Sequence, residues 1–181
     1  VHRWLNTPDN LRKAAKRMGM TSAKSLGEMA LGSLLGTEGR QWGEWQKLIA
    51  WIRTQGKFDV VSFSNSLLTG LAPTIAKELN IPVVCSLQGE DSFLDTLPEP
   101  YRAQSWGAMQ RNARSIRRFI APSQFYADLM RQRLDIEPGQ IKVIPNGIDA
   151  TSFTTSSPDP NWPVIGYFAR MIHGKDLTTL V

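Results

Sequence analysis

Short apolar runs alternate with helical patterns from Phe58 onward, and this alternation limits the fold more than any other feature of the sequence. Four runs read as strands, namely FDVVSF, PVVCSL, FIAP and IKVIP. They are rich in β-branched residues and are bounded by turn-forming residues. Strands that alternate with helices form parallel crossover units. The sequence therefore predicts the α/β class, with a Rossmann-like parallel sheet that has helices on both faces.

Helical patterns also precede the first strand. The pattern RQWGEWQKLIAWIRTQG places Trp42, Trp45, Ile49 and Ile52 on one face. A tryptophan stripe fits a platform for a sugar or a base, and it also fits packing against a sheet. We predict core packing, because the stripe is continuous and ends at a strand.

The composition changes after Asp149, where ATSFTTSSPDPNWP is rich in Ser, Thr and Pro and has no periodicity. We predict three parts: an α/β domain at 1–149 that lacks its first strand, a linker at 150–163, and the start of a second domain at 164–181. The last part reads as a strand, a loop and the beginning of a helix. We therefore expect the chain to be a fragment.

Composition narrows the possible partners. Lys and Arg total 21 against 16 Asp and Glu, a net charge of +5, which favours an anionic partner. The single cysteine, Cys85, excludes an internal disulfide framework, and its apolar neighbours predict a buried, unreactive thiol. No apolar run approaches the ~20 residues that span a bilayer.

The loops after the predicted strands carry the candidate binding residues. In a parallel sheet these loops meet at the carboxyl ends of the strands, where ligands bind. They contain Asn65, Gln88, Gly89, Glu90 and Asp91. Such polar groups suit a hydroxyl-rich ligand. Glu90 and Asp91 fit either ligand contact or capping of the next segment, and Asn65 fits either ligand contact or a turn.

The stretches FDVVSFSNSLLTGLA, IPVVCSLQGED and IAPSQFYADLMRQRLDIEPGQIKVIPNGIDATSF, followed by VIGYFARMIHGKDLTTLV, resemble glycosyltransferase family 4. Three features account for the resemblance: the PS after a strand, the IPNGID turn, and an Arg five positions before a Lys. It covers about 58–181 well and the first 57 residues poorly. It implies the GT-B fold and a retaining, metal-independent transfer of a sugar from a nucleoside diphosphate to an acceptor hydroxyl.

The resemblance also implies roles for individual residues. Arg170 and Lys175 would clamp the diphosphate of the donor and act as the catalytic cations. The position of Gln88 would lie near the donor sugar, with Gly89 beside it, and both are candidate donor contacts. Asn65, Glu90 and Asp91 are candidate acceptor contacts from their place in the loops, with the alternatives given above. Two positions depart from the family, which usually has Gly at Asp176 and His at Gln88. A glutamine can hydrogen-bond a sugar but cannot act as a general base near neutral pH.

The segment YRAQSWGAMQRNARSIRR, residues 101–118, contains no acidic residue. We predict a helix whose face of Trp106, Met109, Ala113 and Ile116 packs inward, with its arginines roughly opposite. The arginines fit a solvated surface or electrostatic docking on an anionic membrane. Docking would suit a lipid-linked acceptor and a cytoplasmic, inner-membrane location.

Two other functions are compatible with parts of this pattern. One is a GT-B nucleotide-sugar 2-epimerase, which Gln88 does not favour. The other is a basic nucleic-acid-binding domain, which should interleave aromatic and basic residues on one exposed surface. We expect neither nucleic acid nor a metal cofactor, and we expect negligible transferase activity from these 181 residues alone.

Overall fold

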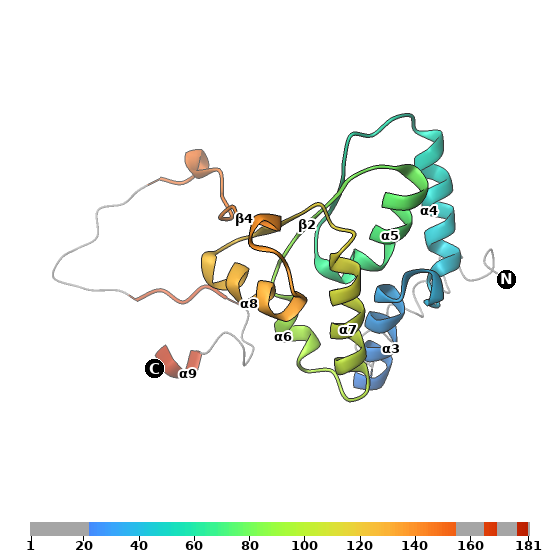
Figure 1. Cartoon of the computed structure of the whole chain (residues 1–181). Helices are drawn as coiled ribbons and strands as arrows, with labels where there is room; N and C mark the ends of the chain where they lie inside the picture. The colour runs from blue at the N-terminus through green and yellow to red at the C-terminus, as the bar shows by residue number, and fades with distance from the viewer. Residues whose placement is uncertain (1–21, 155–164, 170–176, 181) are drawn as a thin grey trace, which may run out of the picture. The chain divides into compact units, whose positions relative to one another are not determined.

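The structure is a computed structural model, which describes residues 22–154, 165–169 and 177–180 (Figure 1). Its contacts divide the chain into two units, Val1–Asn146 and Gly147–Val181. The described elements of the first unit are, in chain order, α3 (Ala23–Leu34), η2 (Gly36–Glu38), α4 (Trp42–Thr54), β1 (Val61–Phe63), η3 (Ser66–Leu71), α5 (Ala72–Thr74), η4 (Ile75–Leu79), β2 (Val83–Ser86), α6 (Glu90–Leu94), α7 (Tyr101–Ala113), β3 (Arg118–Ala121), α8 (Gln124–Leu134), η5 (Pro138–Gln140) and β4 (Ile141–Val143).

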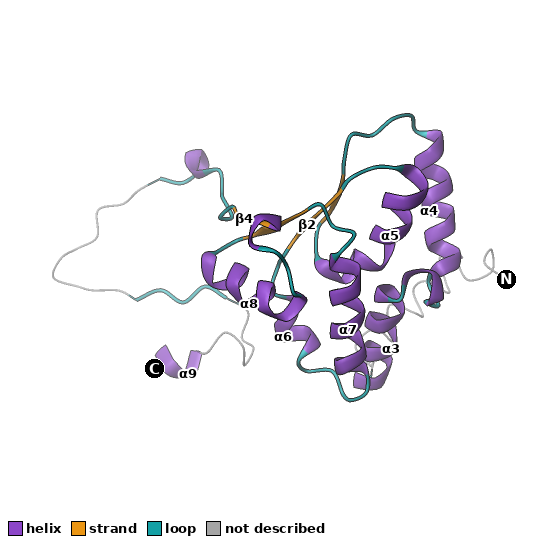
Figure 2. Cartoon of the chain, in the orientation of Figure 1, coloured by secondary structure: helices purple, strands orange, loops and turns teal. Residues whose placement is uncertain are grey.

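The four strands form one parallel sheet in the order β1-β2-β3-β4. Figure 2 colours the strands orange and the helices purple. Phe63 pairs with Cys85, Cys85 with Phe119, and Phe119 with Ile141. The first three of these side chains are buried, so one row crosses the sheet and anchors the core. The predicted α/β class and its Rossmann-like parallel sheet are therefore confirmed.

The helices that connect the strands, namely α5 with η4, α7 and α8, lie on one face of this sheet. On the opposite face Ser62, Arg118 and Lys142 are exposed, while Val84 and Ile120 are half-buried. All three connections step in the same direction across the sheet, and right-handed crossovers then place their helices on the same side. Helices on both faces, as the sequence predicted, are not seen in the described part of the chain.

The helices before the first strand belong to the same core. α3 packs against α7 and η3. The Asn112 side-chain amide donates to the carbonyl of Leu34 at 2.8 Å, and the Ser33 hydroxyl donates to the carbonyl of Leu67 at 2.9 Å. The approach between η2 and η3 is close, because a Cβ on Gly36 would collide with the carbonyl oxygen of Gly70.

The tryptophan stripe of α4 packs as predicted. Ile49 and Ile52 are buried, and Trp42 and Trp45 are partly buried against the core. The prediction of core packing is confirmed, and the sugar platform is not needed to explain these residues.

The helix expected over 101–118 is shorter than predicted. α7 ends at Ala113, and Arg118 already belongs to β3. The amides of Ser115 and Ile116 bond carbonyls three residues back, which tightens the chain into a turn. The amide of Arg117 then donates to the carbonyl of Val83 at 2.7 Å, so pairing with β2 ends the helical run. Ile116, on the expected apolar face, is still buried.

The second unit is described in part. η6 (Ala150–Ser152) is capped by Asp149, whose carboxylate accepts from the amide of Thr151 at 3.0 Å. α9 (Leu177–Leu180) lies near the end of the chain. Residues 165–168, expected as a strand, pair with no other strand and are not part of the main sheet. The predicted division at 149, 163 and 164 stays a prediction.

Candidate functional site

Three loops leave the sheet at the carboxyl ends of β1, β2 and β3. We call residues 64–66, 88–91 and 122–123 the carboxyl rim. The parallel register places these strand ends beside one another. The rim therefore brings together the predicted residues Asn65, Gln88, Gly89, Glu90 and Asp91 from two neighbouring loops.

Gln88 and Gly89 form the outer part of the loop after β2. The Gln88 side chain is exposed, so its amide is available to a ligand. Gly89 has a φ of 92°, in the left-handed region that favours glycine, and it begins α6. The Ser92 hydroxyl donates to the Gly89 carbonyl at 2.8 Å, which holds this turn against the helix.

Glu90 is the buried member of the rim and is only 5% exposed. Its Oε1 accepts from the backbone amide of Ser66 at 2.6 Å. Its Oε2 accepts from the amide of Gln88 at 2.7 Å and from the Tyr126 hydroxyl at 3.0 Å. The carboxylate is thus engaged within the protein by donors from the loops after β1 and β2 and from α8. Its predicted contact with an acceptor stays a prediction.

Asn65 and Asp91 are half-buried at the same rim. The Asn65 side-chain oxygen accepts from the amide of Leu67 at 3.1 Å and caps η3, which supports the turn interpretation. Asp91 lies in the first turn of α6, where a carboxylate is favourable against the helix dipole. The structure leaves both predicted acceptor roles untested.

Tyr126 contacts the rim from α8, and sequence reasoning missed it. It lies in α8, just after Ser123, whose hydroxyl accepts from the Tyr126 amide at 3.2 Å and caps the helix as predicted. Burial, followed by the negative charges of Glu90 and Asp91, raises the pKa of its hydroxyl well above the usual range. The hydroxyl therefore keeps its proton and remains a donor to Glu90.

Cys85 is fully buried in β2, close to this site. Burial, and to a lesser extent the charge of Glu90, raises the pKa of its thiol well above the usual range. A thiolate is the reactive form, so this thiol is unreactive at neutral pH. The sequence prediction for Cys85 is confirmed.

The model of Glycosyltransferase Family 4 matches residues 27–152, which is more than half of the chain. The chain belongs to this family. The match begins inside α3, so it includes helices that the sequence related only poorly to the family. No curated protein and no solved structure matches the chain at a significant level.

The cations that family 4 would use for the donor diphosphate, Arg170 and Lys175, lie outside the described residues. Their predicted roles stay predictions. Among the residues that the structure describes, no three His, Cys, Asp or Glu side chains come together as a metal site would require. The described helices include none that is long and apolar enough to cross a membrane.

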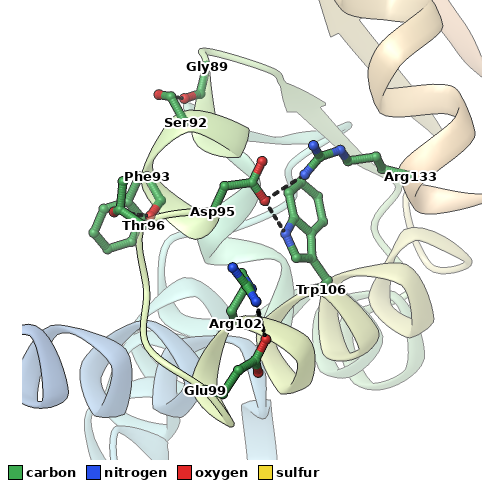
Figure 3. A network of polar contacts seen from close by, with 9 residues as sticks. All are labelled: Gly89, Ser92, Phe93, Asp95, Thr96, Glu99, Arg102, Trp106 and Arg133. Carbon is green, nitrogen blue, oxygen red and sulfur yellow. Dashed lines mark hydrogen bonds and ion pairs between the residues drawn. The ribbon is translucent and has the colours of Figure 1, made fainter. Parts of the chain in front are cut away.

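A polar network beside the rim joins three helices of the family 4 domain (Figure 3). The Asp95 carboxylate, just after α6, accepts from the Trp106 indole at 3.0 Å and from the Arg133 guanidinium at 2.7 Å. That guanidinium lies over the indole ring, 4.7 Å from its centroid. The hydrogen bond from Arg133 is the main cause that lowers the pKa of Asp95. The network ties α6 to α7 and α8 below the rim.

A hollow of about 860 Å³, which we call the basic hollow, lies at the amino-terminal ends of β2 and β3, opposite the carboxyl rim. Arg114, Arg117 and Arg118 line it together with Glu137 and Gln140. All three arginines are exposed, and none forms an ion pair with another residue that the structure describes. Three of the four arginines that were expected on one helix face thus line this hollow, whereas the fourth, Arg111, lies elsewhere on α7.

Proposed function

We propose that this chain forms the acceptor-side part of a retaining glycosyltransferase that uses a nucleoside-diphosphate sugar as donor. One observation carries the proposal. The family 4 domain presents exposed Gln88 beside half-buried Asn65 and Asp91 on adjacent strand ends. Amide and carboxylate groups in this arrangement can donate to and accept from several sugar hydroxyls.

The proposed chemistry divides between two sets of residues. Arg170 would grip phosphate oxygens through two N–H groups, and Lys175 would add a point charge. Negative charge grows on the diphosphate as the glycosidic bond breaks, so these cations stabilise the transition state more than the ground state. Loss of either cation should cost about 2–4 kcal/mol of transition-state stabilisation. Gln88 would orient a sugar by hydrogen bonds and would not remove a proton.

Binding is the first test, because the sequence predicts negligible turnover by these 181 residues alone. The isotope-labelled chain is titrated with UDP-glucose, UDP-N-acetylglucosamine and GDP-mannose while its amide resonances are followed. We expect shifts at Gln88 and Gly89 for at least one donor. Arg170→Ala and Lys175→Ala should each weaken that donor at least tenfold. Lys24→Ala, which removes an exposed lysine on α3, should not.

Two results would count against this function. No donor binding at millimolar concentration would remove its basis, and equal weakening by Lys24→Ala would assign the effect to net charge. Incubation with UDP-N-acetylglucosamine and no acceptor tests the 2-epimerase alternative, since only an epimerase would invert carbon 2. Where transfer to an acceptor is detected, the anomeric configuration of the product distinguishes retention from inversion.

We also propose that the basic hollow binds the phosphate-bearing headgroups of an anionic membrane. Three unpaired guanidiniums on one depression favour phosphate, and each cation near such a surface contributes ~1 kcal/mol. The chain should sediment with vesicles that contain phosphatidylglycerol and be released from them by 0.5 M salt, at which the Debye length is about 4 Å. Substitution of Arg114, Arg117 and Arg118 by Gln should abolish binding.

The control variant removes the same charge from arginines that are ion-paired on the surface: Arg40, Arg53 and Arg102. This variant should still bind the vesicles. An equal loss of binding by the two triple variants would refute a localised headgroup site. Vesicle binding by the variant with Gln at positions 114, 117 and 118 would refute this site as well.

A further inference from the structure

Glu90 places one buried carboxylate between two loops that carry predicted ligand contacts. We propose that Glu90 is a positioning residue, which holds the loop after β1 and the loop after β2 in one arrangement. Its carboxylate would thereby fix the spacing of Asn65 and Gln88 at the carboxyl rim. This inference rests on the proposed function, in which those two side chains meet the sugar.

The bonds of Glu90 reach both loops at their backbone. Oε1 accepts from the amide of Ser66, directly after Asn65, at 2.6 Å. Oε2 accepts from the amide of Gln88 itself at 2.7 Å. These short distances are typical of hydrogen bonds to an ionised acceptor, which are roughly twice as strong as neutral ones. The same carboxylate therefore fixes two backbone positions that lie 22 residues apart in the chain.

Burial and a third donor keep the carboxylate in this role. Glu90 is 5% exposed and Ser66 is fully buried, so water does not compete for their hydrogen bond. The Tyr126 hydroxyl donates to Oε2 at 3.0 Å and ties the group to α8. A ligand on the rim would meet exposed Gln88 before it reached Glu90. The geometry thus favours action through the loops over direct contact with the acceptor.

Amide hydrogen exchange on the 181-residue chain tests this positioning. Glu90→Gln keeps the size of the side chain, but its NH₂ group is a donor and must face one of the donors that the carboxylate bonds. We expect exchange at Ser66 or Gln88 to rise at least about tenfold, since bonds to charged groups are strong and a buried amide is then left unpaired. Exchange at Phe119, in the centre of β3, should change less than threefold.

Two variants separate positioning from general stability. Tyr126→Phe removes only the third donor and should leave exchange at Ser66 and Gln88 within about threefold of the wild type. Ile136→Val trims a buried side chain two residues after the end of α8. It should not raise exchange at Ser66 and Gln88 more than elsewhere. If Glu90→Gln leaves amide exchange at Ser66 and Gln88 unchanged, or raises exchange equally throughout the domain, the proposal is overturned.

Affinity for UDP-glucose and GDP-mannose provides the functional measurement. Glu90→Gln should weaken whichever donor the wild type binds by at least fivefold, while Ile136→Val should bind it like the wild type. Faster exchange at the loops with unchanged affinity would refute the positioning role. If the wild type binds neither of these donors nor UDP-N-acetylglucosamine, the proposed function fails, and hydrogen exchange still decides whether Glu90 holds the two loops.

Discussion

Gly89 has a backbone conformation that side-chain-bearing residues rarely adopt, with φ near 92° and ψ near 30°. A Cβ at this position would meet no heavy atom within 4 Å, so the cost of a side chain there is backbone strain alone. We predict that Gly89→Ala lowers the free energy of unfolding by about 1–2 kcal/mol, measured by urea denaturation.

The matched control for this substitution is Gly43→Ala in α4, which also has open space around its Cβ and is not among the positive-φ glycines. It should stabilise the protein by up to about 1 kcal/mol, because alanine is a better helix former than glycine. Equal effects of the two substitutions would show that the left-handed turn imposes no strain.

Single residues at the rim were predictable where their neighbours in sequence decide their position. Gln88 and Gly89 follow an apolar strand directly, so their place at its carboxyl end could be read from the sequence. The bond between Tyr126 and Glu90 could not, because it joins residues 36 positions apart and no local spacing encodes it. The sequence left open whether Glu90 contacts a ligand or caps the next segment, and for the same reason it did not show that this side chain is buried.

At the scale of the elements, the Asp95 carboxylate links α6 to α7 and α8 through its contacts with Trp106 and Arg133. These contacts also lower the pKa of Asp95. A carboxyl whose pKa is lowered in the folded state stabilises that state while it is ionised. We predict that Asp95→Asn lowers the free energy of unfolding by about 0.2–1 kcal/mol at pH 7, since both partners are partly exposed.

The pH dependence of this difference follows from the direction of the shift. The contribution should be complete well above pH 3.8, the ordinary value, and should disappear as the pH falls through the lower folded-state pKa. Urea titrations of both proteins between pH 7 and pH 2.5 measure the difference. A gap that stays constant over this range, or that grows in acid, would exclude the ionic contribution of Asp95.

Element boundaries were predictable where a local signal sets them and not where tertiary pairing does. Ser123 caps α8 as expected, because its hydroxyl bonds an amide within the same turn. The end of α7 depends instead on the bond from Arg117 to Val83 in a neighbouring strand. Helical periodicity continues through this segment in the sequence, so it could not reveal that a strand begins at Arg118.

At the scale of the whole molecule, the sequence predicted a parallel sheet but not the order of its strands. Apolar runs separated by helices are compatible with any order, and only the order decides whether crossovers cover one face or both. The sequence also left open whether residues 1–57 form a lid over the acceptor or scaffold helices. In the structure α3 packs on α7 and η3, and Leu34 is 1% exposed within the core.

This packing predicts that the described helices before β1 unfold together with the sheet. Leu34→Ala should lower the free energy of unfolding of the whole domain by about 2–5 kcal/mol, because it leaves a cavity in a shared core. Met29→Ala on the same helix should change it by less than about 0.5 kcal/mol, since Met29 is 59% exposed. Urea unfolding followed by tryptophan fluorescence and by far-ultraviolet circular dichroism should give one coincident transition for each variant. If α3 were instead a separate lid, Leu34→Ala would produce an early partial transition and leave the midpoint of the main one unchanged.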